Sequence, residues 1–215
     1  MKTKLAVVLG AGPGLGQALA ERWAHEGYAV VLMARNEARL NEAVRDLRNE
    51  GYEAHARVVD CASNESIRAA LDAVASQLGC IDVLCYNTAV LREGLASQIA
   101  PEELCNRYQV DVAGAVCAVQ AVLPSMRARG EGTVLLTGGG LALSPVSQFT
   151  SLSVHKAALR AYALALNDEV AGDGVFVGIV NIKGNIGSCD TYAPATIARR
   201  FWDLAEAHEA AELTY

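Results

Sequence analysis

Short apolar runs alternate with amphipathic stretches along most of the chain. The apolar runs are rich in valine, as in strands that a parallel sheet buries on both faces, and they span residues 5–9, 29–34, 54–59, 83–86, 133–137 and 175–180. Between and after these runs, apolar positions recur at helical spacing. This pattern predicts helices over residues 15–26, 37–49, 65–78, 101–129, 151–171 and 195–207.

Glycines follow five of these helical segments, at Gly27, Gly51, Gly79, Gly130 and Gly172, where a left-handed cap favours glycine. The repeated alternation of strand and helix predicts an α/β fold with right-handed crossovers. We therefore expect a Rossmann-type, doubly wound parallel sheet of six or seven strands with helices on both faces. Because the sequence shows no linker, repeat or low-complexity segment, we expect a single domain over residues 1–215.

Composition narrows the class of protein. The chain has 215 residues, of which 52% are hydrophobic and 20% charged, and this supports a sizeable core and excludes a disordered chain. The net charge of −6 argues against a nucleic-acid binder, which needs a basic face. No apolar run approaches the roughly 18 residues of a membrane span, and the N-terminus leads directly into a strand. We therefore expect a cytoplasmic protein that binds neither nucleic acid nor membrane.

Cysteine and histidine spacing predicts no metal site. The six cysteines form no C-x-x-C pair, and in a reducing compartment we expect them to be buried thiols; they are Cys61, Cys80, Cys85, Cys105, Cys117 and Cys189. The four histidines are scattered without ligand spacing.

A glycine-rich loop joins the first predicted strand to the first helix. Gly10, Gly14 and Gly16 follow the spacing G-x-x-x-G-x-G, whereas the register G-x-G-x-x-G fails because Leu15 or Gln17 stands where it needs a glycine. Such a loop allows backbone N–H groups and a helix N-terminus to approach a pyrophosphate. A tight turn without a ligand is the alternative, and the position between strand and helix favours a dinucleotide site.

This spacing resembles that of the short-chain dehydrogenase/reductase family, and further motifs extend the resemblance over nearly the whole chain. Asp60, which closes the third predicted strand, matches the family aspartate that contacts adenine. Asn87 lies in a degenerate form of the N-N-A-G motif, and Lys156 fits the lysine of the Y-x-x-x-K helix. The resemblance implies an NAD(P)-binding oxidoreductase.

The resemblance also implies further cofactor contacts. Residues 183–188 occupy the place of the P-G-x-x-x-T segment, where the Ile186 backbone and the Ser188 hydroxyl would hold the nicotinamide carboxamide. Leu15 belongs to the cofactor set through its place in the glycine loop, and Lys156 would bind the ribose.

Charge at the end of the second strand predicts the preferred cofactor. An NAD site places a carboxylate here for the ribose 2′-hydroxyl, but this chain has Arg35 followed by Asn36. A guanidinium attracts a 2′-phosphate and binds it bidentately, although an exposed arginine at the start of the next helix is the alternative. We therefore expect NADP(H) to be preferred over NAD(H), with Arg35 and Asn36 at the 2′-phosphate.

Most of the family's catalytic residues are replaced. Matched position by position, Leu152 stands for the tyrosine, Gly139 for the serine and Asp111 for the asparagine, and Lys156 alone is retained. Leucine donates no proton, and general acid catalysis is typically worth on the order of 10² to 10⁴ in rate. The resemblance therefore implies an atypical member in which ordinary ketone reduction is crippled.

Three interpretations remain. In the first, the protein is an NADPH-dependent oxidoreductase that transfers hydride to a small C=O, C=N or activated C=C substrate, with Lys156 and Asp111 as catalytic residues and Asp111 stabilising a cation or relaying a proton. In the second, it is a non-redox isomerase or cyclase. In the third, it is an inactive cofactor-binding homologue that serves as a partner subunit or sensor. We favour the first because the predicted cofactor ligands persist together.

Several other residues are candidates for chemistry. His155 is a candidate for a substitute acid, as are the hydroxyls of Thr137 and Ser153. Glycines 138–140 either offer a row of backbone N–H groups to a substrate oxygen or form a flexible turn without that role. Phe201 and Trp202 favour packing over a substrate platform.

Apolar residues on the two longest predicted helices bear on assembly. We expect Cys117, Leu159, Ala163 and Leu166 to be among the residues of exposed apolar faces. The family resemblance implies a homodimer or homotetramer built on these helices, and a monomer with a thicker core is the alternative.

Overall fold

Seven parallel strands form one sheet in a computed structural model that describes residues 3–215. The strands are β1 (Leu5–Leu9), β2 (Ala29–Ala34), β3 (Ala54–Val58), β4 (Val83–Tyr86), β5 (Gly132–Thr137), β6 (Val175–Asn181) and β7 (Glu212–Thr214), in the order β3-β2-β1-β4-β5-β6-β7. All six strand pairings are parallel. The predicted doubly wound parallel sheet is therefore confirmed.

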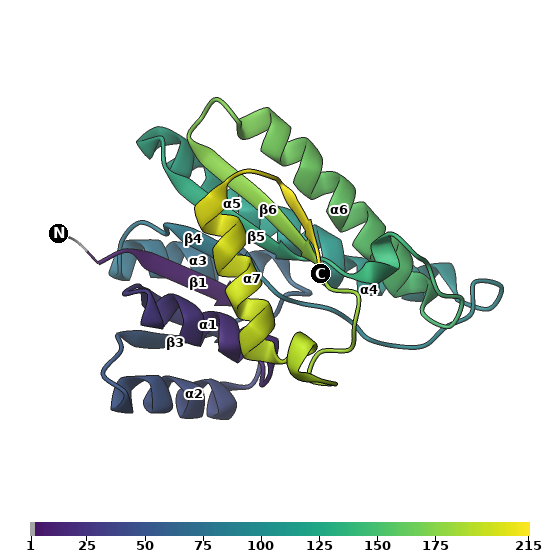
Figure 1. Ribbon diagram of the computed structural model, residues 1–215, viewed down its shortest axis with the longest axis horizontal. Helices are drawn as coiled ribbons and strands as arrows, with labels where there is room; N and C mark the ends of the chain where they lie inside the picture. Colours follow the sequence, from purple (N-terminus) through teal and green to yellow (C-terminus); the bar gives the residue numbers. More distant parts are fainter. Residues whose placement is uncertain (1–2) are drawn as a thin grey trace.

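Helices cover both faces of this sheet, as Figure 1 shows. One face packs against α1 (Leu15–His25), α2 (Glu37–Asn49) and α7 (Pro194–Ala207), and the other against α3 (Asn64–Gln77), α5 (Gly114–Arg129) and α6 (Thr150–Val170). Along β1, Val7 and Leu9 enter one core while Ala6 and Val8 enter the other. This two-sided burial explains why the strands are continuous apolar runs.

A single helical rod of 29 residues contains a π-helical turn. It consists of α4 (Pro101–Tyr108), the π-turn η1 (Gln109–Ala113) and α5. The Val110 carbonyl of η1 accepts hydrogen bonds from the hydroxyls of Tyr86 at 2.6 Å and Thr88 at 3.0 Å. Within residues 3–215, this rod is the one helix whose length and apolar composition match a membrane span, and 56% of its most apolar window is buried in the protein. A buried core helix meets the same criteria.

The last strand was not predicted individually. β7 has three residues, too few for a strand pattern, and it pairs with β6 between Ile179 and Asn181. Arg160 of α6 binds the Glu212 carboxylate bidentately at 2.5 and 2.6 Å, and the Asn181 amide donates to the same carboxylate. Contacts between residues distant in sequence therefore hold β7 beside β6 as the last strand of the sheet.

One predicted helix cap is wrong. Gly27, Gly51, Gly79 and Gly130 have positive φ as expected, but Gly172 does not. Gly174 takes the left-handed conformation instead, with φ +71°. A Cβ at Gly174 would lie 2.1 Å from the Gly130 carbonyl oxygen, so this close approach explains the position of the glycine.

The expectation that all six cysteines are buried is also wrong. Cys61, Cys85 and Cys117 are buried, and burial raises the thiol pKa of Cys61 to about 11 and of Cys85 to about 12. The other three are exposed because they lie on a loop or on the outer side of a helix; they are Cys80, Cys105 and Cys189. No cluster of three or more potential metal ligands occurs among residues 3–215.

The predicted exposure of the two long helices is wrong at four positions. Leu159 and Ala163 are fully buried, and Leu166 and Cys117 are nearly so. These side chains belong to the core between the helices and the sheet. The apolar face of each helix thus packs against the chain's own sheet. Phe201 is likewise a core residue, and Trp202 packs edge-to-face on Trp23 at 4.9 Å, as expected of packing residues.

Candidate cofactor and catalytic site

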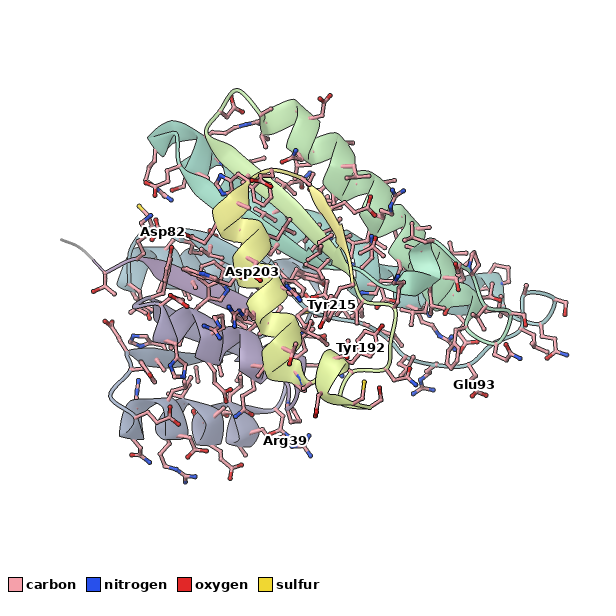
Figure 2. The ribbon with its side chains drawn as sticks, viewed as in Figure 1. Arg39, Asp82, Glu93, Tyr192, Asp203 and Tyr215 are labelled. Atoms are coloured by element: carbon pink, nitrogen blue, oxygen red, sulfur yellow. The ribbon has the colours of Figure 1, made fainter. Side chains whose placement is uncertain are left out.

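The carboxyl ends of the strands bring the predicted site residues to one edge of the sheet. Loops leave this edge after β1, β2, β4, β5 and β6. The strand order reverses between β1 and β4, which is where open α/β sheets bind ligands. Figure 2 shows Arg39 on α2, Tyr192 on the short helix η3 (Asp190–Tyr192) and Glu93 on the β4–α4 loop along this side of the molecule.

The backbone requires glycine at three positions in and beside the first loop, through close contacts at Gly10 and Gly16 and through a positive φ at Gly14. A Cβ at Gly10, where φ is +83°, would lie 2.1 Å from the Asn87 carbonyl oxygen. A Cβ at Gly16 would lie 2.2 Å from the Gly10 carbonyl oxygen, and Gly14 has φ +100°. At Gly12, by contrast, a Cβ would meet nothing within 4 Å. The backbone therefore needs the same three glycines that define the G-x-x-x-G-x-G spacing.

We expect Gly16→Ala to lower the free energy of unfolding by about 1–3 kcal/mol, because the added methyl group meets backbone that has no room to give. Gly12→Ala is the matched control in the same loop, and we expect it to be neutral or slightly stabilising. Urea denaturation of both variants measures the difference. Equal losses in the two variants would contradict the steric account.

Asn87 links the glycine loop to the end of β5. Its amide nitrogen donates to the Gly10 carbonyl oxygen at 3.1 Å, and its amide oxygen accepts from the Thr137 hydroxyl at 2.9 Å. Asn87 therefore lies beside the glycine loop, and its contact with a cofactor stays a prediction. The Thr137 hydroxyl already donates its proton here, which weakens its candidacy as a substitute acid.

Lys156 has a buried side-chain amine that lies beside the carboxyl end of β5. It lies on α6 with 4% of its surface exposed, and its Nζ donates to the Thr137 carbonyl oxygen at 2.5 Å. Burial lowers its pKa to about 8, and the Asp111 carboxylate opposes that shift. Both protonation states of Lys156, the ammonium and the neutral amine, are therefore populated near neutral pH.

Asp111 and His155 form a buried pair behind the site. Asp111 Oδ2 lies 2.8 Å from His155 Nδ1, and both side chains are fully buried. Asp111 Oδ1 accepts from the Val90 backbone N–H at 2.7 Å, so both carboxylate oxygens are engaged. Protein groups therefore already engage Asp111, and its expected role of stabilising a cation or relaying a proton stays a prediction. His155 is equally removed from solvent, which argues against it as the substitute acid.

Sequence reasoning did not find this pair, because its members are 44 residues apart and no local spacing joins them. The π-turn η1 carries Asp111, whereas α6 carries His155. His155 Nε2 has no hydrogen-bond partner among the described residues, and the Tyr108 ring packs edge-to-face on the imidazole at 5.5 Å.

Glycines 138–140 do not offer the predicted row of free amides. The Gly138 N–H donates to the Val180 carbonyl oxygen at 2.9 Å, and the Gly140 N–H donates to that of Ile182 at 2.7 Å. A Cβ at Gly138 would lie 2.1 Å from Asn181 Oδ1, so glycine is needed there for packing. These amides bind the neighbouring strand β6 and its extension instead of a ligand.

Gly139 differs from its neighbours because packing does not require glycine there. Gly139 has an extended backbone that any residue adopts, and a Cβ there would meet only ordinary contacts, the nearest being Lys156 Cγ at 3.5 Å. Leu152 is buried on the first turns of α6, near Ser153, whose hydroxyl donates to the Phe149 carbonyl oxygen at 3.0 Å. The bonded Ser153 hydroxyl is therefore not a free acid either.

The other predicted cofactor residues lie along the same edge, most of them exposed: Arg35, Asp60, Ile186 and Ser188. Asn36 caps α2 by accepting the Arg39 backbone N–H at 3.1 Å, and Asp60 accepts that of Ala62 at 3.0 Å. The Leu15 side chain is buried in the core. Arg39, a second exposed guanidinium at the start of α2, was not identified from the sequence (Figure 2). Contacts of these residues with a cofactor stay predictions.

Comparison with known proteins identifies the class. The sequence profile of the short chain dehydrogenase family matches residues 4–192. The chain therefore belongs to the short-chain dehydrogenase/reductase family of oxidoreductases.

Solved structures and a curated relative agree with this assignment. L-sorbose reductase from Gluconobacter frateurii, complexed with NADPH and L-sorbose, is 26% identical with a TM-score of 0.91, over 100% of this chain and 95% of that one. A metagenomic short-chain oxidoreductase in complex with NADP is 25% identical with a TM-score of 0.90, over 99% and 96%. A short chain dehydrogenase from Pseudocercospora fijiensis is 29% identical over 197 residues, which are 88% of this chain and 63% of that protein.

Proposed function

We propose that this chain is an NADPH-dependent oxidoreductase with a non-standard active site, which reduces a small C=O, C=N or activated C=C substrate. The observation that carries the proposal is the glycine loop, in which Gly10, Gly14 and Gly16 keep the backbone free of side chains at the start of α1. The two solved relatives at 25% and 26% identity, whose crystals contain NADP or NADPH, support it.

The residues at this edge fit a nicotinamide dinucleotide. The N–H groups of the glycine loop and the N-terminus of α1 suit the pyrophosphate. When bound, the cofactor supplies a hydride. Each remaining contact carries over from the family, with Asp60 at the adenine, Asn87 beside the loop, Lys156 at the ribose, and Ile186 and Ser188 at the carboxamide.

Arg35 supports NADPH over NADH. Its exposed guanidinium follows β2 directly, and Arg39 adds a second positive charge at the start of α2. Neither residue following β2 is a carboxylate, so nothing at these positions repels a 2′-phosphate. A phosphate bound by two guanidiniums gains charge-assisted hydrogen bonds that a 2′-hydroxyl does not provide.

The replaced residues define the chemistry that the site favours. Leu152 has no proton to give, and Gly139 offers no hydroxyl to polarise a carbonyl. Substrates that need little help from an acid therefore suit the site best, such as an iminium that already carries positive charge or an alkene activated by conjugation. The test is an assay of NADPH oxidation with matched ketone, iminium and enone compounds, and turnover of none of them would contradict the proposal.

Restoring both lost groups is expected to raise ketone reduction. The double variant Leu152→Tyr with Gly139→Ser should increase the rate by on the order of 10²-fold, the lower end of what general acid catalysis supplies. Position 139 has room for a side chain, because the nearest atom to an added Cβ is 3.5 Å away. The single variants are the controls. If the double variant binds NADPH but gains no ketone reduction, the pocket does not accept carbonyl compounds.

The same two replacements favour a second candidate function, a cofactor-binding homologue without catalysis that acts as a partner subunit or sensor in a homo-oligomer or other assembly. An isomerase or cyclase on this scaffold is the remaining alternative. NADPH binding without oxidation across the compound panel separates these functions from the proposed reductase.

A further inference from the structure

The two replaced residues, Gly139 and Leu152, leave no polar side chain of their own beside the buried Lys156. The three atoms nearest to a Cβ built on Gly139 all belong to the Lys156 side chain, namely Cγ at 3.5 Å, Cδ at 3.9 Å and Cε at 4.0 Å. A serine at position 139 would place its side chain over this aliphatic stem. Leu152 lies one helical turn before Lys156 on α6 and brings no polar atom to it. The two replacements therefore act on the surroundings of one amine.

Other proton donors near Leu152 are already engaged. Both Asp111 oxygens accept hydrogen bonds, and the hydroxyls of Thr137 and Ser153 donate to Asn87 and to the Phe149 carbonyl. His155 Nδ1 is paired with Asp111 Oδ2 at 2.8 Å. The Lys156 ammonium has three protons, of which one is used in the hydrogen bond to the Thr137 carbonyl. Two protons of Lys156 thus remain for bound ligands, namely the cofactor ribose and a substrate.

We propose, on the basis of the proposed reductase function, that Lys156 Nζ gives the proton to the substrate in place of the missing tyrosine. In the reduction of a carbonyl compound, the carbonyl carbon receives the hydride and the C–O π bond breaks. The oxygen takes a proton from Nζ, so that one N–H bond breaks and one O–H bond forms. Lys156 is left as a neutral amine and recovers a proton from water.

The charges around Lys156 suit this role. Burial favours the neutral amine and Asp111 of η1 favours the ammonium, which together hold the pKa at about 8. His155 of α6 contacts Asp111, and Lys183, which follows β6, packs its stem on Gly140. A pKa near the working pH lets an acid be charged and still release its proton readily, as general acid catalysis requires.

An experiment with two substrates of similar shape separates proton donation from cofactor binding. Tetralone needs a hydride and a proton, whereas the N-methyldihydroisoquinolinium cation needs only a hydride, since it becomes a neutral amine. Lys156→Arg keeps the positive charge for the ribose, but a guanidinium does not release a proton near neutral pH. Because Lys156 is also expected to contact the ribose, the diagnostic quantity is the ratio of the two rates at saturating NADPH. We expect this variant to lose on the order of 10²-fold more in tetralone reduction than in iminium reduction.

The pH dependence tests whether Lys156 is the group that gives the proton. With the wild type, tetralone reduction should fall as the pH rises through about 8, whereas iminium reduction should stay flat. Asp111→Asn removes the negative charge that raises the Lys156 pKa, so the fall should move to lower pH. NMR titration of ¹³C-labelled lysine reads the same pKa without turnover. A Lys156 pKa at the ordinary value near 10.4, in the protein with or without NADP⁺, would overturn the proposal.

Two kinetic outcomes also overturn it. If Lys156→Arg loses both substrates equally while NADPH still binds, Lys156 only holds the cofactor. If the wild type reduces the iminium but not tetralone, Lys156 is not a proton donor, and the proposed reductase function stands. Reduction of neither compound, or failure to bind NADPH, would instead count against the proposed function, so the two failures are distinguishable.

Discussion

Asp111→Ala is expected to lower the free energy of unfolding by about 3–5 kcal/mol, because it removes one partner of a buried, hydrogen-bonded pair. The Val90 N–H would lose its acceptor, and the fully buried His155 would keep neither of its ring nitrogens hydrogen-bonded. The π-turn that carries Asp111 would also lose one of its hydrogen bonds to the β4–α4 loop, while that from Thr88 to the Val110 carbonyl would remain.

Urea denaturation followed by circular dichroism measures this loss. Asp72→Ala is the matched control, since Asp72 is an exposed aspartate on α3, and it should change stability by no more than about 0.5 kcal/mol. A loss below about 1 kcal/mol in Asp111→Ala would mean that the pair contributes no more than an exposed ion pair does.

Arg35→Asp is expected to weaken NADPH binding by about 10²-fold while NADH binding stays the same or improves. The substitution removes charge-assisted hydrogen bonds worth roughly 1.5–3 kcal/mol and sets a carboxylate against the 2′-phosphate. The same carboxylate suits the 2′-hydroxyl of NADH. Nicotinamide fluorescence titrations give both dissociation constants.

Arg45→Asp makes the same charge change at an exposed position in the second half of α2. It serves as the control for the general loss of positive charge. It should affect the two cofactors equally and weakly. Equal losses for NADPH and NADH in Arg35→Asp would remove the basis for a preference.

Most of the helices and strands were predictable from the sequence, because the hydrophobic pattern of each one arises within its own segment. β1, β2 and β4 begin and end where the apolar runs do, since both faces of each strand are buried. The π-turn depends on Tyr86 and Thr88, which bind the Val110 carbonyl from another part of the chain, so no helical pattern contains it. β7 depends on Arg160 in the same way.

The site residues show the same difference between features set by local sequence and features set by contacts distant in sequence. The glycine positions were predictable because their steric need arises within one loop and its neighbour. The pairing of Asp111 with His155 was not, because it depends on the packing of η1 against α6. Exposure of Leu159 and Ala163 was predicted wrongly, since an apolar helix face fits a partner subunit and the chain's own sheet equally well.

Titration of the purified protein with NADPH and with NADH, followed by nicotinamide fluorescence, tests the proposed cofactor site most directly. The glycine loop and Arg35 predict saturable binding of NADPH that is tighter than that of NADH. Binding of neither nucleotide would contradict the proposed oxidoreductase function and would direct the search toward a protein partner.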